Sequence, residues 1–353
     1  KHQYIKIFFQ KSPNIEITFI NPFFKKRDLE LALKKGMDAQ SEIYIWGKKE
    51  FDEIETFAKE KHITLARMED GFIRSFDLGS DLTQPYSQVI DKKGIYFDPT
   101  QESDLEDILN NIHFDSTILR RAEVLRHYLV EHKISKYNIY GDVTIVLPQN
   151  RNIVLVPGQV EDDASIKYGA SGMTNFQLLK EARKNSPESY IIYKPHPDVL
   201  AGNRVGAVDE KEALLYCDTI VTHVSLDSIV SLCDEVHTMT SLVGFESLLR
   251  GKKVFTYGMP FYAGWGLTID QKSCERRRKK LSLDELTAGA FILYPVYINP
   301  QNNRICEIEE ILNVIESQKE RYQHDKIYKL KKDIRNRIVR KILTFITLLK
   351  KRY

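Results

Sequence analysis

The sequence predicts an α/β protein made of two units in which strands and helices alternate. Short apolar runs rich in β-branched residues recur between segments with helical spacing, first in residues 1–140 and again in residues 150–300. Gly, Pro and Asn residues between Lys136 and Asn152 suit a linker between the units. We therefore expect two Rossmann-like domains that face a cleft, followed by a C-terminal helical extension in residues 301–353.

In the first unit, the pattern predicts strands at 43–47, 63–67 and 94–97, and helices at 51–61, 104–111 and 117–132. In the second unit, it predicts strands at 153–156, 190–193, 219–221, 236–239 and 254–257. Helices are expected there at 175–184, 210–216, 225–232 and 245–250, and later at 282–290 and 307–318.

Composition narrows the class of protein. A chain of 353 residues has room for about two domains, and 42% hydrophobic with 29% charged residues is ordinary for a globular protein. The four cysteines have no close pairing, which argues against a zinc ribbon or a disulfide framework and fits a reducing compartment. No apolar run reaches membrane-spanning length, and the first residues do not resemble a signal peptide. Neither a dinucleotide fingerprint nor a Walker A sequence follows a predicted strand.

Three consecutive acids, Glu161, Asp162 and Asp163, follow the buried strand at 153–156. The carboxyl end of a parallel strand is where open α/β sheets place ligands, and acids there can serve as nucleophile, general base or metal ligand. The alternative is a solvated acidic turn.

Two further candidate sites also follow strands of the second unit. Lys194 and His196 lie among prolines that fix the backbone, so they suit an anionic ligand or proton transfer; the alternative is a loop histidine bonded to a backbone carbonyl. Thr240, Ser241 and Glu246 surround the start of a helix, where phosphate and ribose could bind; the alternative is helix capping.

Two loops complete the set of candidates. The aromatic and glycine-rich loop at 258–268 could line a sugar or base pocket, or pack against the core. In the first unit, Glu69, Asp70 and Arg74 lie in a turn that could hold a polar acceptor or a donor carboxylate, or could form a local ion pair.

Taken together, the stretches VPGQVEDDASI, KPHPDV, HTMTSLVGFESLL and PFYAGWGLT resemble the capsule-polysaccharide β-Kdo glycosyltransferases of the KpsC type. The resemblance runs from about Ile43 to about Pro300 and is to the C-terminal of that family's two catalytic modules. It implies a GT-B-like fold, with residues 1–140 on the acceptor side and residues 150–300 binding a CMP-sugar. Full members carry two modules, so a sister β-Kdo transferase module is an expected partner.

The resemblance also implies a reaction. Members transfer Kdo from CMP-Kdo to a Kdo-terminated acceptor on phosphatidylglycerol, and the C-terminal module is associated with β-(2→7) linkage. Retention is expected to proceed by double displacement through Asp163, with Glu161, Asp162 and His196 left open as the acid/base group. Lys194, Ser165 and Arg74 would meet the Kdo carboxylate or CMP phosphate, and Gln159 joins these donor-binding candidates. Thr240, Ser241 and Glu246 would hold CMP, and no metal or other cofactor is expected.

The C-terminal segment indicates where the protein works. Residues from Asp325 to Tyr353 contain eleven Lys and Arg and two Asp, a net charge of +9, which leaves about −6 for the rest of the chain. Apolar residues at helical spacing run through this segment, so we expect a basic amphipathic helix on an anionic membrane, at the inner face of the cytoplasmic membrane. The alternative is a docked terminal helix with solvated charges.

No nucleic-acid motif accompanies these charges, so nucleic acid is not an expected partner. Two other functions stay open at this point: a non-catalytic module that binds Kdo chains or organises capsule assembly, and a transferase for another CMP-sugar.

Overall fold

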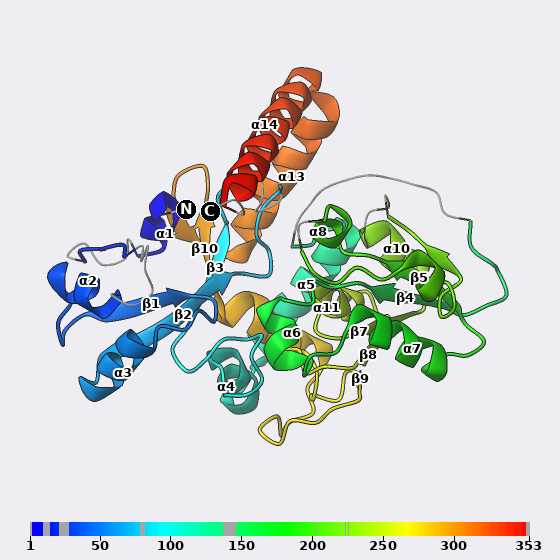
Figure 1. Cartoon of the computed structure of the whole chain (residues 1–353), viewed down its shortest axis with the longest axis horizontal. Helices are drawn as coiled ribbons and strands as arrows, with labels where there is room; N and C mark the ends of the chain where they lie inside the picture. The colour runs from blue at the N-terminus through cyan, green and yellow to red at the C-terminus, as the bar shows by residue number, and fades with distance from the viewer. Residues whose placement is uncertain are drawn as a thin grey trace.

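The structure is a computed structural model that describes residues 2–9, 15–20, 28–77, 82–136, 146–202, 204–222, 224 and 226–350. Part of the expected linker, residues 137–145, lies outside these ranges. The chain forms an α/β fold with two sheets, which lie on opposite sides of the molecule in Figure 1.

The second sheet is entirely parallel, with the strand order β6-β5-β4-β7-β8-β9. Its strands are β4 (Ile153–Pro157), β5 (Tyr190–Lys194), β6 (Thr219–Ile220), β7 (Glu235–Thr238), β8 (Lys253–Thr256) and β9 (Ile269–Asp270). The first five confirm the predicted strands within two residues. Every residue of β4 is buried, which agrees with a central parallel strand covered on both faces. This order is that of the Rossmann fold, and it reverses between β4 and β7.

Helices surround this sheet: α6 (Ala164–Gly169), α7 (Asn175–Asn185), α8 (Pro197–Leu200), α9 (Glu210–Ala213), α10 (Leu226–Leu232) and α11 (Leu242–Leu249). For several of these helices, the side chain that caps the N-terminus explains where the helix begins. Thr174 and Gln177 form a capping box at the start of α7, and Asp209 caps α9. Helix α11 begins at Leu242 instead of the expected Phe245, because Ser241 supplies its N-cap.

The first sheet is mixed, with the order β1-β2-β3-β10-β11. Strands β1 (Glu42–Trp46) and β2 (Thr64–Asp70) are parallel, whereas β3 (Ser87–Asp91), β10 (Pro295–Asn299) and β11 (Arg304–Cys306) pair antiparallel. The helices that precede or follow these strands are α1 (His2–Phe8), α2 (Asp28–Lys34), α3 (Asp52–Glu60), α4 (Asp104–Asn111) and α5 (Ser116–Glu131).

The expected strand at 94–97 is wrong. The strand of this region is β3, and the chain turns immediately after it. Asp91 Oδ1 accepts hydrogen bonds from the backbone N–H groups of Lys93 and Gly94, at 3.1 and 2.7 Å, and this tight turn ends the strand. Ile95 is fully buried in the turn, so its apolar character reflects core packing.

Residues 295–306 return to the first sheet, where β10 pairs with β3. The expected second unit ran to residue 300, so the structure differs from that boundary. Helix α12 (Leu283–Thr287) and a π-helical segment, Ala288–Leu293, bring the chain back. The sequence does not predict that this strand joins the first sheet, because the residue pattern of an antiparallel strand is the same whichever sheet it belongs to.

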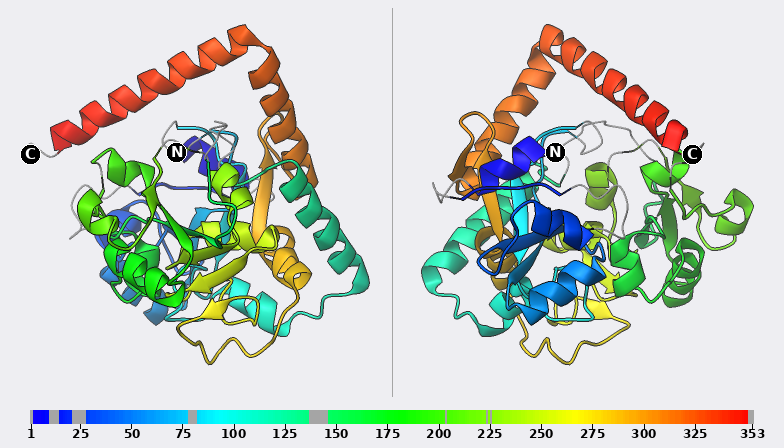
Figure 2. Two further views of the ribbon diagram at one scale, coloured as in Figure 1. Left: turned by 90° about the vertical axis from the view of Figure 1, so that its right-hand side faces the viewer. Right: turned by 60° about the vertical axis from the view of Figure 1, so that its left-hand side comes forward.

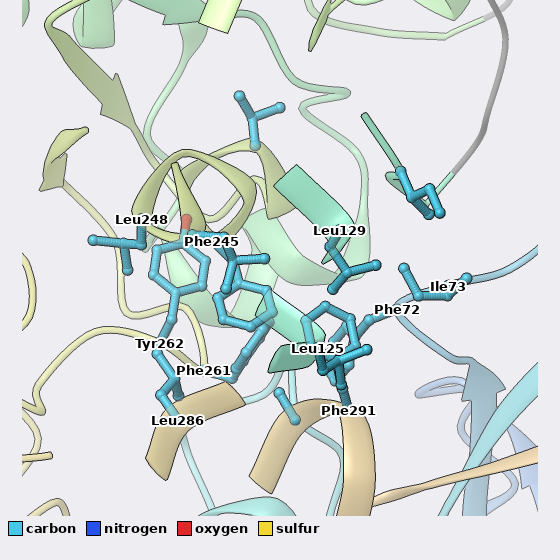
Figure 3. Packing of buried hydrophobic residues seen from close by; sticks show 14 of the residues in the cluster. Phe72, Ile73, Leu125, Leu129, Phe245, Leu248, Phe261, Tyr262, Leu286 and Phe291 are labelled. Carbon is cyan, nitrogen blue, oxygen red and sulfur yellow. The ribbon is translucent and has the colours of Figure 1, made fainter. Parts of the chain in front are cut away.

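One hydrophobic core joins the two sheets. It contains Phe72 and Ile73 beyond β2, Leu125 and Leu129 of α5, and Phe245 of α11, as Figure 3 shows. The aromatic loop at 258–268 belongs to this core: Tyr262 and Trp265 are fully buried, and the rings of Phe72 and Phe261 lie 4.6 Å apart. Of the two roles expected for this loop, lining a pocket or packing against the core, the structure therefore shows packing against the core.

Two long helices end the described chain, α13 (Ile308–His324) and α14 (Lys326–Lys350). Figure 2 shows that α13 rises from the body and that α14 turns at its tip and runs back across the molecule. Among the described residues, no helix is long and apolar enough to cross a membrane.

Candidate functional site

The candidate site lies where the strand order of the parallel sheet reverses. Loops leave the carboxyl ends of β4 and β7 side by side at this point, which is the usual ligand position in an open α/β sheet. Gln159 links the two loops: its Nε2 donates to Thr240 Oγ1 at 3.0 Å, and its Oε1 accepts from the Thr240 N–H at 2.9 Å. Thr240 Oγ1 in turn donates to Ser165 Oγ at 3.3 Å. These three predicted site residues therefore form one hydrogen-bonded group.

The three consecutive acids have different environments. Glu161 Oε1 accepts a hydrogen bond from the Asn175 N–H at 2.7 Å, which ties it to the start of α7. Asp162 is exposed and forms an ion pair with Arg204 at 3.1 Å. Asp163 is also exposed and is the N-cap of α6, where its Oδ1 accepts from the N–H and Oγ of Ser165 at 2.9 and 2.8 Å. Of the three, Asp163 leaves an accessible carboxylate without an ion pair among the described residues.

A buried asparagine holds the acidic loop in place. Asn175 Nδ2 donates to the carbonyl oxygens of Gln159 and Gly206 at 2.7 and 2.8 Å, and its Oδ1 accepts from the Gln159 N–H at 2.8 Å. Gly206 has a φ of +130°, and a Cβ there would come within 2.8 Å of Asn175 Nδ2. The sequence pattern gives no sign of this role for Asn175, because an Asn at a helix start is normally a cap.

Glu69, in the first sheet, is within electrostatic reach of this loop. It lies near the end of β2, and burial raises the pKa of its carboxyl group to about 7. The negative charges of Asp70 and Asp163 raise this pKa further, whereas a hydrogen bond from the Asp70 N–H and the positive charge of Lys136 lower it. Asp163 is therefore within electrostatic reach of a carboxyl group that belongs to the other sheet.

Lys194 and His196 follow β5, next to the acidic loop. Burial lowers the pKa of Lys194, and among the described residues its ammonium group has no hydrogen-bond or ion-pair partner. His196 is the N-cap of α8, and its Nδ1 accepts from the Asp198 N–H at 3.2 Å, which leaves Nε2 as the protonated nitrogen of the neutral ring. Burial lowers the pKa of His196, while the charge of Asp163 acts in the opposite direction.

Arg74 and Asp70 adopt the local ion pair that sequence analysis gave as the alternative. Arg74 Nε lies 2.6 Å from Asp70 Oδ2, and its Nη1 donates to Ser75 Oγ at 3.0 Å. Both guanidinium contacts hold Arg74 in a buried position. Within the described residues, Asp70 Oδ1 is buried without a hydrogen-bond partner.

Ser241 and Glu246 are placed by α11. Ser241 Oγ accepts from the Val243 N–H at 3.2 Å, which is the capping alternative. Glu246 was expected in the first helical turn, and this is wrong because the helix begins three residues earlier than predicted. Its Oε1 accepts a hydrogen bond from the Lys136 N–H at 3.0 Å, and burial raises its pKa.

Metal ligands are not grouped in this region. Among the residues that the structure describes, no cluster of three or more His, Cys, Asp or Glu side chains could hold a metal ion.

With this geometry established, comparison with known proteins identifies the family. A sequence profile described as "Capsule polysaccharide biosynthesis protein" matches residues 41–299. The chain belongs to this capsule polysaccharide biosynthesis family. Among curated relatives, the capsule polysaccharide modification protein LipA of Neisseria meningitidis is 44% identical over 308 residues, which are 87% of this chain and 43% of LipA. The lipopolysaccharide-processing protein LpsZ of Rhizobium meliloti is 42% identical over 76% of this chain and 62% of LpsZ. The chain thus spans less than half the length of LipA.

Solved structures of the capsule family have the same fold. The Thermosulfurimonas dismutans KpsC β-Kdo 2,7 transferase superimposes with a TM-score of 0.71 and 37% identity, covering 90% of this chain and 96% of that one. The KpsC β-Kdo 2,4 transferase of the same organism gives 0.70 and 33%, covering 77% and 86%. The resemblance to KpsC-type proteins that the sequence motifs indicated is confirmed.

Proposed function

We propose that the chain is a retaining glycosyltransferase that moves Kdo from CMP-Kdo to a Kdo-terminated, lipid-linked acceptor in capsule biosynthesis. The similarity to both KpsC transferases supports Kdo transfer, and the higher identity and coverage of the 2,7 transferase favour a β-(2→7) linkage. In this proposal the two sheets belong to GT-B-like domains whose facing edges form the substrate cleft.

The observation that carries the proposal is the exposed carboxylate of Asp163 at the strand reversal, which has no ion pair among the described residues and lies within electrostatic reach of Glu69. In the first step, an Asp163 carboxylate oxygen forms a bond to the anomeric carbon of Kdo as the bond to the phosphate of CMP breaks. The bonding electrons leave with CMP, whose phosphate is a good leaving group and needs no proton. The product is a glycosyl ester on Asp163 with inverted configuration.

In the second step, an acceptor hydroxyl opens this ester and restores the original configuration. The hydroxyl oxygen bonds to the anomeric carbon, Asp163 leaves as a carboxylate, and the hydroxyl proton passes to a base. Glu69 suits this role because a carboxyl group with a pKa of about 7 accepts a proton at neutral pH more readily than an ordinary glutamate does. The sequence alone leaves this role open among Glu161, Asp162 and His196.

The other candidates are less suited to act as this base. Glu161 accepts a hydrogen bond from the Asn175 N–H and Asp162 pairs with Arg204, so both carboxylates have structural partners. The only lone pair of the neutral His196 ring, on Nδ1, already accepts a hydrogen bond from the Asp198 N–H, and burial lowers the pKa of the ring, which makes it a weaker base. We assign it to the wall of the site, where its Nε2–H faces away from the Asp198 contact and can donate to substrate.

The donor is held by groups around the strand reversal. Lys194 is a partly buried cation without an anionic partner in the described chain, so it suits the Kdo carboxylate or the CMP phosphate. Ser165 and Thr240 present hydroxyl groups beside Asp163, and Gln159 fixes their loops. Ser241, Glu246, Asp70 and Arg74 complete the proposed binding set, with Arg74 acting through its pair with Asp70.

The proposed acceptor is Kdo on phosphatidylglycerol, and the proposed location is the inner face of the cytoplasmic membrane. A sister β-Kdo transferase module remains a proposed partner, because the chain covers 43% of LipA.

The test is incubation of the purified chain with CMP-Kdo, generated in situ, and a synthetic Kdo-terminated acceptor, followed by mass spectrometry and NMR. The proposal expects a product one Kdo heavier, with a β-(2→7) linkage. Donor binding without product or released CMP would instead indicate a Kdo-binding module. Transfer from a different CMP-sugar in direct competition would indicate another donor.

A further inference from the structure

Helix α14 has an apolar stripe that faces solvent. Its members recur every three or four residues, so they share one face of the helix. Each is at least half exposed, at 67, 61, 50, 52 and 52% in chain order. The stripe consists of Ile327, Leu330, Ile334, Ile338 and Ile342.

The opposite, polar face of α14 contacts the body of the protein. Lys332 Nζ lies 3.1 Å from Asp77 Oδ2 and 3.7 Å from the centroid of the Phe76 ring. Asn336 is buried and donates to Asp77 Oδ1 at 3.4 Å. A terminal helix that stabilises a globular body normally packs its apolar face inward. The structure therefore disagrees with the simple docked-helix alternative, in which the charges alone would face solvent.

Positive charges lie within and beside the stripe. On a helical projection, Lys331 and Lys341 fall between its apolar positions, Arg335 and Arg337 lie along its two edges, and all four are exposed. The helix contains a single acidic residue, Asp333, which accepts a hydrogen bond from Tyr322 Oη at 2.8 Å. A second copy of the same helix would bring like charges together. An anionic surface complements both the stripe and the positive charges on the same face.

We propose that α14 lies on an anionic phospholipid membrane, with the stripe inserted at the level of the headgroups and its lysines and arginines on lipid phosphates. The proposal goes beyond the proposed transferase function and does not rest on it. Lys332 and Asn336 face the protein in this arrangement, so they hold the bound helix to the body.

The contact at Asp77 also connects this surface to the candidate site. Ser75 Oγ donates to the Asp77 carbonyl oxygen at 2.5 Å and accepts from Arg74 Nη1 at 3.0 Å. Arg74 in turn pairs with Asp70, the neighbour of Glu69. Helix α14 is thus linked to the Asp70–Arg74 ion pair through consecutive short contacts.

The test is vesicle flotation of the full chain without donor or acceptor. One set of vesicles contains phosphatidylcholine alone, and the other contains phosphatidylcholine and phosphatidylglycerol in equal parts. The variant Leu330→Gln/Ile334→Gln/Ile338→Gln removes the apolar stripe, and Lys331→Glu/Arg337→Glu/Lys341→Glu reverses three of the positive charges on the same face. The matched control, Val124→Gln/Leu215→Gln, changes apolar residues that are 55 and 73% exposed elsewhere. Circular dichroism and thermal melting check that each variant folds.

We expect binding to the phosphatidylglycerol vesicles only, weakened by salt. Each α14 variant should lower the partition coefficient by about tenfold or more, and the control should bind like the unmodified chain. Unchanged binding of the folded stripe variant would overturn the proposal, as would failure of the unmodified chain to bind. A dimer in sedimentation velocity that the stripe variant converts to monomer would assign the stripe to a second copy instead.

Discussion

Glu69 of the mixed sheet lies within electrostatic reach of Asp163 of the parallel sheet, and the Asp163 charge helps to raise the pKa of Glu69 to about 7. The two carboxyl groups differ in environment. Glu69 is largely withdrawn from water, whereas Asp163 is exposed and accepts two hydrogen bonds from Ser165. Glu69 therefore holds a proton more readily than an ordinary glutamate does, which suits a group that receives the proton of the acceptor hydroxyl in the second step.

The first prediction concerns the proposed nucleophile. Asp163→Asn should lower Kdo transfer by about three orders of magnitude or more, because an amide cannot form the glycosyl ester. Asn retains the capping role at α6, so the fold and CMP binding should persist. Transfer assays and calorimetric titration with CMP measure the two effects.

Asp162→Asn is the matched control for this variant, since Asp162 is the adjacent exposed acid. It should keep most of its transfer activity. Full transfer activity of Asp163→Asn would remove the nucleophile assignment.

The second prediction concerns the pH dependence of the second step. A base must be ionised to accept a proton, so transfer should rise with pH and level off above an apparent pKa near 7. Glu69→Gln should abolish this rise and lower the rate at pH 8 by about 100-fold. The readout is kcat measured from pH 5 to 9 at saturating donor, and a rise that persists in Glu69→Gln would assign it to another group.

The third prediction is a stability effect of the same residue. Because the folded pKa of Glu69 lies above its unfolded value, the folded state holds its proton more tightly, and stability is lost as pH rises through about 4.5 to 7. Gln cannot ionise. Glu69→Gln should therefore gain stability relative to the unmodified chain across this interval, by about 1–3 kcal/mol. Urea unfolding at pH 5 and pH 8 measures the gain, which should be small at pH 5; an equal effect at both values would contradict the raised pKa.

The fourth prediction tests how the acidic loop is held. Asn175→Ala leaves three buried backbone groups without their side-chain partner, two on Gln159 and one on Gly206. The free energy of unfolding should fall by about 2–4 kcal/mol, and CMP binding should weaken as the loop loosens. Asn111→Ala serves as control because Asn111 makes an exposed contact to Asp107, and it should change stability by less than about 0.5 kcal/mol.

Much of the second unit could be predicted from sequence because its strands are buried on both faces. Continuous apolar runs such as Ile153–Val156 are distinctive, and the polar loops after them mark the carboxyl edge of the sheet. The first unit was harder to predict. Residues 94–97 have the composition of a strand, but their burial comes from a turn that Asp91 closes.

The aromatic loop shows why burial cannot be predicted from composition. Phe261, Tyr262 and Trp265 could have lined a pocket or filled a core. They fill the core because Phe72 and Phe245, which come from other elements, pack against Phe261, and Phe245 also packs against Tyr262; no local pattern encodes those contacts.

The sequence by itself determined the α/β class, the position of the candidate site at strand ends, and the family, because these depend on local periodicity and on long motifs in a fixed order. Tertiary structure alone decided which of the acids has the raised pKa and which face of α14 meets solvent. A pKa depends on burial and on charges from other elements, as for Glu69 beside Asp163, and the exposed face of a helix depends on its neighbours, as for Asn336 against Asp77. Both are properties of residues far apart in the chain.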